Sequence, residues 1–358
     1  MGWREYEKNN FISLTESNIL KGVALIFMYI HHMFTYPGMY IDGINYPSLE
    51  TFVQIFRHPF NPVSIFCFIT GYAYVFSKNK TLKQSLKKIF KILIPFWVVM
   101  ITLMIIGILT NTYNFSIGNF ILESLSLKRT IMCFCWYIYF YVIVMITMPF
   151  ISKVSEKMNA TQNVLVLLFI PVTIFYALKG IFFNNDIIVD ILNNLIRFYP
   201  TVIAGYLVSK YDVFNKLESI NIKERYRLIL CFFVLVSSFL LKYLVPYVGY
   251  GTISTRRHLL DLTMNLDIVY TPLFIYSFIK LARLFNAKLY IPLIKIGKLS
   301  MLMWFTHCLF FNCSKEIFMP ILYAPGNAIL VLIWAIILNY AMAFLFNIVT
   351  SRLVKLIK

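Results

Sequence analysis

About ten apolar stretches, each roughly 20 residues long, follow one another along this chain of 358 residues. Hydrophobic residues make up 60% of the chain and charged residues only 13%, which leaves too little polar surface to cover a water-soluble domain. A helix of this length crosses a bilayer because it satisfies its backbone hydrogen bonds internally. The apolar runs are continuous rather than alternating, which excludes a transmembrane β-barrel. The sequence therefore predicts an all-α fold, a polytopic membrane helix bundle with about ten transmembrane helices.

The loops between the apolar stretches predict the orientation of the chain. Most lysines and arginines lie in every second loop, which is typical of cytosolic loops and places both termini in the cytosol. The net charge of +18 follows from these loops, and we expect no nucleic-acid partner because a basic stripe with interleaved aromatic residues is missing. The expected spans are 18–36, 57–77, 90–110, 131–151, 162–179, 191–209, 226–246, 265–284, 296–313 and 326–350.

No linker or soluble segment separates domains, so we expect a single integral membrane domain over residues 1–358. Residues 288–298 leave an alternative open, since this segment could lie flat at the interface before the ninth span. We see no removable signal peptide at the N-terminus. The six cysteines lie within or beside apolar spans and are expected to be small buried residues rather than a disulfide framework or a metal site.

Two ionisable residues lie inside the first span. Lys21 and His32 are eleven positions apart, which places both side chains on nearly one face of a helix, roughly 16 Å apart along its axis. An ionisable group at bilayer depth is costly and is read first as functional. The alternatives are a hydrogen-bonded packing role for His32 and a Lys21 ammonium that extends to the lipid headgroups. A neutral buried imidazole can accept a proton, so His32 is the candidate catalytic base.

Lysines gather where the third span leaves the cytosol. Lys88 and Lys91 are three residues apart and are therefore neighbours on one helix face. They either hold the helix end at the membrane surface or bind phosphate groups of a ligand.

The remaining candidates point to the opposite membrane surface. In the second span, Gly71 allows close approach of another helix. Arginines in outer loops are unusual because cationic residues concentrate in cytosolic loops, so we expect these arginines to contact either an anionic substrate or lipid phosphates. Aromatic residues at the outer surface form either a membrane belt or a sugar-binding surface. His307 is a second imidazole inside a predicted span and is therefore also a candidate. The candidate substrate-binding residues are Arg57, His58, Trp136, Tyr139, Arg256, Arg257 and His307.

Taken together, these segments resemble the acyltransferase 3 family of integral membrane acyltransferases. Lys21, ten residues and then His32 match the family pattern of Arg or Lys, ten residues and His. The stretch VSIFCFITGYAYVF is similar to the second helix of the family, with Thr70 in place of the usual Ser. KKIFKILIPFW resembles its Arg-x-x-Arg entry to the third helix, with Lys88 and Lys91 in place of both arginines. CFCWYIYFYVIVMITMPF, RFYPTVIAGYLVSKY and IGKLSMLMWFTHCLF resemble later segments.

The resemblance implies a membrane O-acyltransferase in the plasma membrane. It would move an acetyl group from cytosolic acetyl-CoA to a hydroxyl of an exported or lipid-linked cell-surface polysaccharide. His32 would act as general base or as transient acyl carrier, and Lys21, Lys88 and Lys91 would bind the CoA phosphates. No metal is expected, and membrane lipid and a second copy of the chain are possible partners. The alternatives are a glycan or lipid-linked glycan transporter and a non-catalytic scaffold, since several spans with intramembrane charges fit a transporter too.

Overall fold

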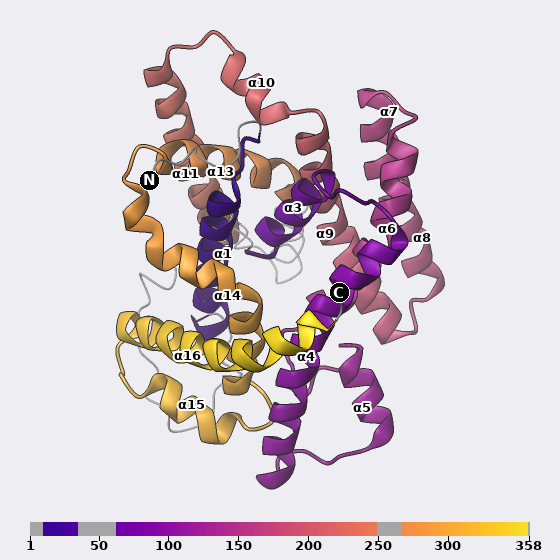
Figure 1. Ribbon diagram of the computed structural model, residues 1–358, viewed down its shortest axis with the longest axis vertical. Coiled ribbons are helices and arrows are strands. Elements are labelled where there is room, and N and C mark those ends of the chain that lie inside the picture. The colour runs from indigo at the N-terminus through magenta and orange to yellow at the C-terminus, as the bar shows by residue number, and fades with distance from the viewer. Residues whose placement is uncertain (1–9, 35–61, 249–265, 357–358) are drawn as a thin grey trace. The chain divides into compact units, whose positions relative to one another are not determined.

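The computed structural model describes residues 10–34, 62–248 and 266–356 (Figure 1). These residues form helices and no strand, which confirms the all-α prediction. The helices are α1 (Leu14–Phe34), α3 (Pro62–Val75), α4 (Leu82–Leu109), α5 (Ile117–Ser124), α6 (Tyr137–Ser155), α7 (Ala160–Val164), the π-helix η2 (Leu165–Phe169), α8 (Ile170–Ile181), α9 (Asp186–Lys210), α10 (Val213–Ser219), α11 (Glu224–Val248), α13 (Asp267–Ala282), the 3₁₀ helix η3 (Ala287–Tyr290), α14 (Ile291–His307), the 3₁₀ helix η4 (Cys308–Phe310), α15 (Lys315–Tyr323) and α16 (Ala328–Lys355).

Among the described residues, six helical stretches are long and apolar enough to cross a membrane. The other four predicted spans also contain helices, but α3 and α13 have only 14 and 16 residues, and α1 and α11 carry several polar or charged residues. The count of about ten spans and the cytosolic termini therefore stay predictions. The six stretches are Leu82–Leu109, Tyr137–Ser155, Ala160–Ile181, Asp186–Lys210, Ala287–Phe310 and Ala328–Lys355.

Two segments show how the helix boundaries compare with the sequence prediction. Residues 131–136 form turns, so the helix of the fourth expected span begins only at Tyr137. Residues 288–298 do not form a separate segment, because η3 leads directly into α14. At residues 131–136 the apolar run continues across the change in backbone conformation, so hydropathy alone does not mark where the helix begins.

Packing divides the chain into two compact units, which are described one at a time. The first comprises residues 1–31, 51–78 and 154–298, and the second comprises residues 32–50, 79–153 and 299–358. The helices α1 and α14 are continuous and contribute residues to both units. The prediction of a single domain over residues 1–358 stays a prediction.

In the first unit, α3 packs against α9 at two glycines (Figure 1). A Cβ atom on Gly71 would lie 1.8 Å from the carbonyl oxygen of Val202, and one on Gly205 would lie 2.1 Å from that of Phe68. Only glycine permits backbones to approach so closely. The expectation that Gly71 allows close helix approach is thus confirmed, with α9 as the neighbour.

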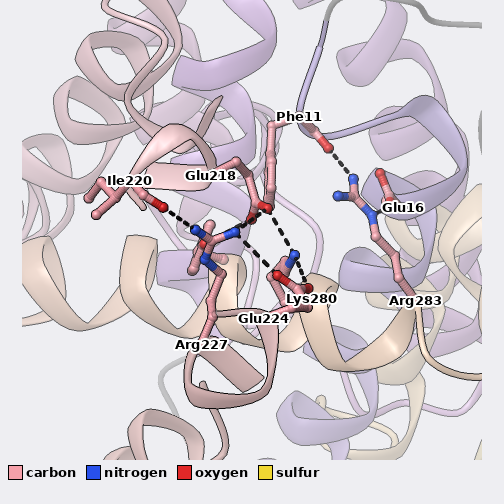
Figure 2. A network of polar contacts seen from close by, with 9 residues as sticks. Phe11, Glu16, Glu218, Ile220, Glu224, Arg227, Lys280 and Arg283 are labelled. Atoms are coloured by element: carbon pink, nitrogen blue, oxygen red, sulfur yellow. Dashed lines mark hydrogen bonds and ion pairs between the residues drawn. The ribbon is translucent and has the colours of Figure 1, made fainter. Parts of the chain in front are cut away.

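The start of α1 is held by side chains of the first unit. Ser13 and Glu16 form a reciprocal capping box, in which each side chain accepts a hydrogen bond from the other residue's backbone N–H. The guanidinium of Arg283 donates to Glu16 and to the backbone carbonyl of Phe11 (Figure 2). The helix that carries Lys21 and His32 therefore begins at a well-defined residue.

An ion-pair cluster lies next to these contacts in the first unit (Figure 2). Glu218 accepts from Arg227 and Lys280, and both cations also contact Glu224. Burial disfavours the charge on Glu218, but hydrogen bonds from Lys280 and Tyr276 and the neighbouring cations outweigh it and hold the pKa of this carboxyl below its ordinary value. The cluster joins the end of α10 and the first turn of α11 to α13.

The second unit contains α4, α5, most of α6, the end of α14, α15 and α16. The indole of Trp97 on α4 donates to the carbonyl of Ser124 at the end of α5. Thr306 on α14 donates to the buried Asn339 of α16. These bonds hold the last turn of α14, and with it His307, inside the second unit.

Candidate functional site

The end of α1 and the end of α14 bring two histidines together in the second unit. His32 lies in the last turn of α1, and His307 is the last residue of α14, 275 positions away. His32 Nδ1 and His307 Nε2 are 2.9 Å apart, and the two rings are nearly parallel with centroids 5.1 Å apart. His307 is buried, at 2% exposure, and His32 is half-buried. The two imidazoles therefore form a hydrogen-bonded pair.

The hydrogen-bond partners of His307 determine which nitrogens carry protons. His307 Nδ1 lies against the backbone carbonyl oxygen of Trp304, and a carbonyl oxygen only accepts. In the neutral pair His307 therefore carries its hydrogen on Nδ1, and its Nε2 accepts the hydrogen of His32 Nδ1. The remaining lone pair of His32 then lies on Nε2. This tautomer makes His32 Nε2 the basic atom of the pair.

The ring of Phe134 covers one side of the histidine pair. It stacks on His32 with centroids 3.8 Å apart and an angle of 13° between the planes, and it lies 5.4 Å from His307. Such a contact restricts rotation of the His32 ring, and an aromatic face favours a positive charge next to it. The sequence analysis did not single out Phe134, because it is one apolar residue within an apolar run.

Two buried cysteines lie beside Phe134 and His307 in the chain. Cys135 and Cys308, which follow Phe134 and His307 in the chain, are both buried, with sulfur atoms 3.7 Å apart. All six cysteines of the chain are free thiols. Within the described ranges, no three His, Cys, Asp or Glu side chains are arranged to hold a metal ion.

The structure also locates the residues expected to bind the acyl donor. Lys88 and Lys91 lie one turn apart near the start of α4, with Lys88 half-buried and Lys91 exposed. Lys21 lies on α1, half-buried, and the residues between it and His32 on that face, Leu25 and Met28, are buried. Lys21 belongs to the first unit and the other two lysines to the second. A donor site formed by all three stays a prediction.

Two of the candidate acceptor-binding residues follow Phe134 closely in the chain. Trp136 is half-buried in the turn before α6, and Tyr139 on α6 is buried, at 7% exposure. The Trp136 ring contacts Phe140 and Tyr137. His307, predicted to bind substrate, lies within hydrogen-bond distance of His32, and its contact with substrate stays a prediction. The other candidates, Arg57, His58, Arg256 and Arg257, lie outside the described residues.

Comparison with known proteins gives one finding. A family model described as an acyltransferase domain matches residues 14–350, nearly the whole chain. This range includes His32, Phe134 and His307. No curated protein and no solved structure matches the chain significantly. The match confirms the family resemblance that the sequence motifs indicated.

Proposed function

The chain belongs to the acyltransferase 3 family of membrane acyltransferases, and from this premise we propose that it is an O-acetyltransferase. It moves an acetyl group from cytosolic acetyl-CoA to a hydroxyl of an exported or lipid-linked cell-surface polysaccharide, at the plasma membrane. The observation that carries the proposal is the hydrogen bond between His32 and His307, because its tautomer leaves a basic nitrogen, Nε2, on His32.

In the proposed reaction, His32 Nε2 takes the proton of the acceptor hydroxyl as the hydroxyl oxygen bonds to the thioester carbonyl carbon. The carbon–sulfur bond then breaks, and the proton passes from His32 to the departing sulfur. The products are an acetyl ester and CoA with a free thiol, and His32 returns to its neutral state. In a second route through the same atom, Nε2 bonds to the thioester carbonyl carbon as the carbon–sulfur bond breaks, which gives an acetyl-imidazolium and the CoA thiolate. The hydroxyl oxygen then takes the acetyl group from Nε2, and its proton passes to the thiolate.

His307 supports either route. It accepts the Nδ1 hydrogen of His32 and so holds the ring with Nε2 directed away from the pair. When Nε2 takes a proton, the shared hydrogen bond and the face of Phe134 stabilise the resulting positive charge. This is the role that an orienting group has beside a catalytic histidine, although here the orienting group is a second imidazole.

The donor is bound through its phosphates. Lys88 and Lys91 supply two cations on one face of α4, and Lys21 on α1 is a further candidate for the same phosphates. Lysine binds phosphate as a point charge, so these contacts give affinity with little geometric selection. The extended arm of the donor then spans the distance from Lys21 to His32, roughly 16 Å along the axis of α1.

The acceptor binds from the other membrane surface. We propose that Trp136 and Tyr139 stack on sugar rings, while Arg57, His58, Arg256 and Arg257 contact polar or anionic groups of the glycan. Membrane lipid surrounds the bundle, and a second copy of the chain is a further possible partner.

The proposal is tested by comparing surface glycan from cells with and without the protein. Mass analysis should show acetyl groups that disappear with the gene, and purified protein should transfer label from isotope-labelled acetyl-CoA to glycan from the deficient cells. Loss of exported glycan with no change in its acetylation would instead support transport of the glycan and refute the transferase assignment.

A further inference from the structure

The end of α5 has an unusual residue at a position that favours glycine. Ser126 has a left-handed backbone with φ of 58°. The N–H of Ser126 bonds to the carbonyl of Glu123, and that of Leu127 bonds to the carbonyl of Leu122. This pair of bonds is a Schellman motif, in which the left-handed residue is usually glycine and sometimes asparagine. A serine there keeps a less favourable backbone, which calls for a compensating interaction.

The same motif occurs at the end of α4 with an ordinary residue. Asn111 has a φ of 57°, its N–H bonds to the carbonyl of Ile108, and the next N–H, that of Thr112, bonds to the carbonyl of Gly107. Asn111 is exposed and belongs to a residue type that tolerates this backbone. The two helix ends thus differ in the residue at one equivalent position.

The side chain of Ser126 explains its presence. Its hydroxyl donates a hydrogen bond of 2.6 Å to the backbone carbonyl of Cys135, and Ser126 is fully buried. Cys135 directly follows Phe134, whose ring stacks on His32. Glycine would relieve the backbone but would remove this bond. Ser126 therefore ties the end of α5 to the backbone beside Phe134.

Glu123 makes a second contact from α5 to the same loop. Its carboxylate is fully buried and accepts from the N–H groups of Thr130 and Ile131. Burial raises the pKa of Glu123, although these bonds favour the ionised form. The charge is therefore costly, whereas an acceptor oxygen at this position satisfies buried backbone donors.

We propose that Ser126 is a positioning residue for His32: with Glu123 it holds the 130–135 segment so that the Phe134 ring lies against the catalytic imidazole. The inference rests on the proposed role of His32 as base. The hydrogen bond from the Ser126 hydroxyl offsets the less favourable backbone at this residue and orders the segment that carries Phe134.

The experiment uses the full chain purified in detergent and compares S126G with N111G. Both variants place glycine at a left-handed helix end, but only S126G loses a bond to the Phe134 segment. We expect both to keep the wild-type melting temperature. In S126G, kcat should fall about tenfold, since a misplacement of roughly 1 Å at a reacting group can cost about 100-fold, while KM for acetyl-CoA stays within about twofold. N111G should keep the wild-type kcat.

A second pair of variants tests the contact from Glu123. E123Q keeps an acceptor oxygen without the charge and should retain kcat. E123L has a similar size but no acceptor, so it should lower kcat as S126G does and also lower the melting temperature, because the N–H groups of Thr130 and Ile131 lose their acceptor. The inference is overturned if S126G keeps the wild-type kcat or if E123Q loses as much activity as E123L.

A readout that does not depend on acyl transfer separates this inference from the proposed function. Diethylpyrocarbonate modifies accessible imidazoles, and mass spectrometry of peptides gives the modification rate of His32. We expect a rate several-fold higher in S126G than in N111G, because a loosened Phe134 uncovers one face of the ring. Equal rates would overturn the positioning role even if the wild-type protein transferred no acetyl group.

Discussion

Replacing His32 by asparagine separates the proposed catalytic role of this residue from its role in packing. The Nδ2 amide of asparagine takes the position of histidine Nδ1, so it can still donate to His307 Nε2, which lies 2.9 Å from His32 Nδ1. Asparagine has no counterpart of His32 Nε2. The variant H32N therefore keeps the hydrogen bond and removes the basic atom.

The two effects have different expected sizes. Loss of a general base lowers the rate by about 10²–10⁴-fold, which corresponds to about 2.7–5.5 kcal/mol in activation free energy. H32N should lose this much activity with little change in stability. His32→Ala should lose at least as much activity, and it also leaves the buried Nε2 of His307 without the His32 donor, at a cost of about 1–3 kcal/mol in the free energy of unfolding. If His32 carries the acetyl group covalently, the loss in both variants is larger.

The assay measures transfer from isotope-labelled acetyl-CoA to glycan of deficient cells, with melting temperature and monodispersity as controls. His31→Ala is the matched control on the same helix, since His31 points about 100° away from His32, and it should be milder. Near-normal transfer by H32N with a loss in His31→Ala would refute His32 as the base. If neither change nor His307→Ala affected transfer, the enzyme assignment would lose its main physical support.

Three further predictions follow from the lysines, the loops and the ion-pair cluster. Changing Lys88 and Lys91 together to Gln should weaken acetyl-CoA binding several-fold or more, because charged hydrogen bonds contribute about 1.5–3 kcal/mol. Arg at both positions should restore the affinity measured by calorimetry, and an unchanged affinity in the Gln variant would remove both residues from the site. A cysteine label near Lys83 should react only after permeabilisation and one near Gly249 in intact cells, so external labelling at residue 83 would invert the topology. The folded pKa of Glu218 is below its ordinary value, so its stabilising effect is present above the ordinary pKa and lost as the pH falls through the folded one; thermal melts should show that E218Q flattens this decline, and equal pH profiles would contradict it.

The sequence by itself determined the class of the protein and the composition of single helices. A chain with 60% hydrophobic and 13% charged residues cannot cover a water-soluble domain with polar surface, so the all-α membrane fold follows from solvation alone. The helical repeat placed Lys21, Leu25, Met28 and His32 on one face of α1, because neighbours three and four positions apart share a face whatever the helix packs against. The absence of a side chain at Gly71 likewise predicted a close helix contact.

Only the tertiary structure decided what those faces meet. His307 was a candidate because an intramembrane imidazole is costly, but its bond to His32 joins residues 275 positions apart, and no periodicity within one helix encodes such a pair. Nothing in the sequence indicated a contact between Phe134 and His32, because lipid and protein interior both favour an apolar ring. In this chain, burial and lipid contact therefore look alike in sequence. The tautomer that makes His32 Nε2 basic depends on a backbone carbonyl, that of Trp304, and every residue type has one. The sequence therefore identified candidate residues, and long-range packing determined which of them lie together.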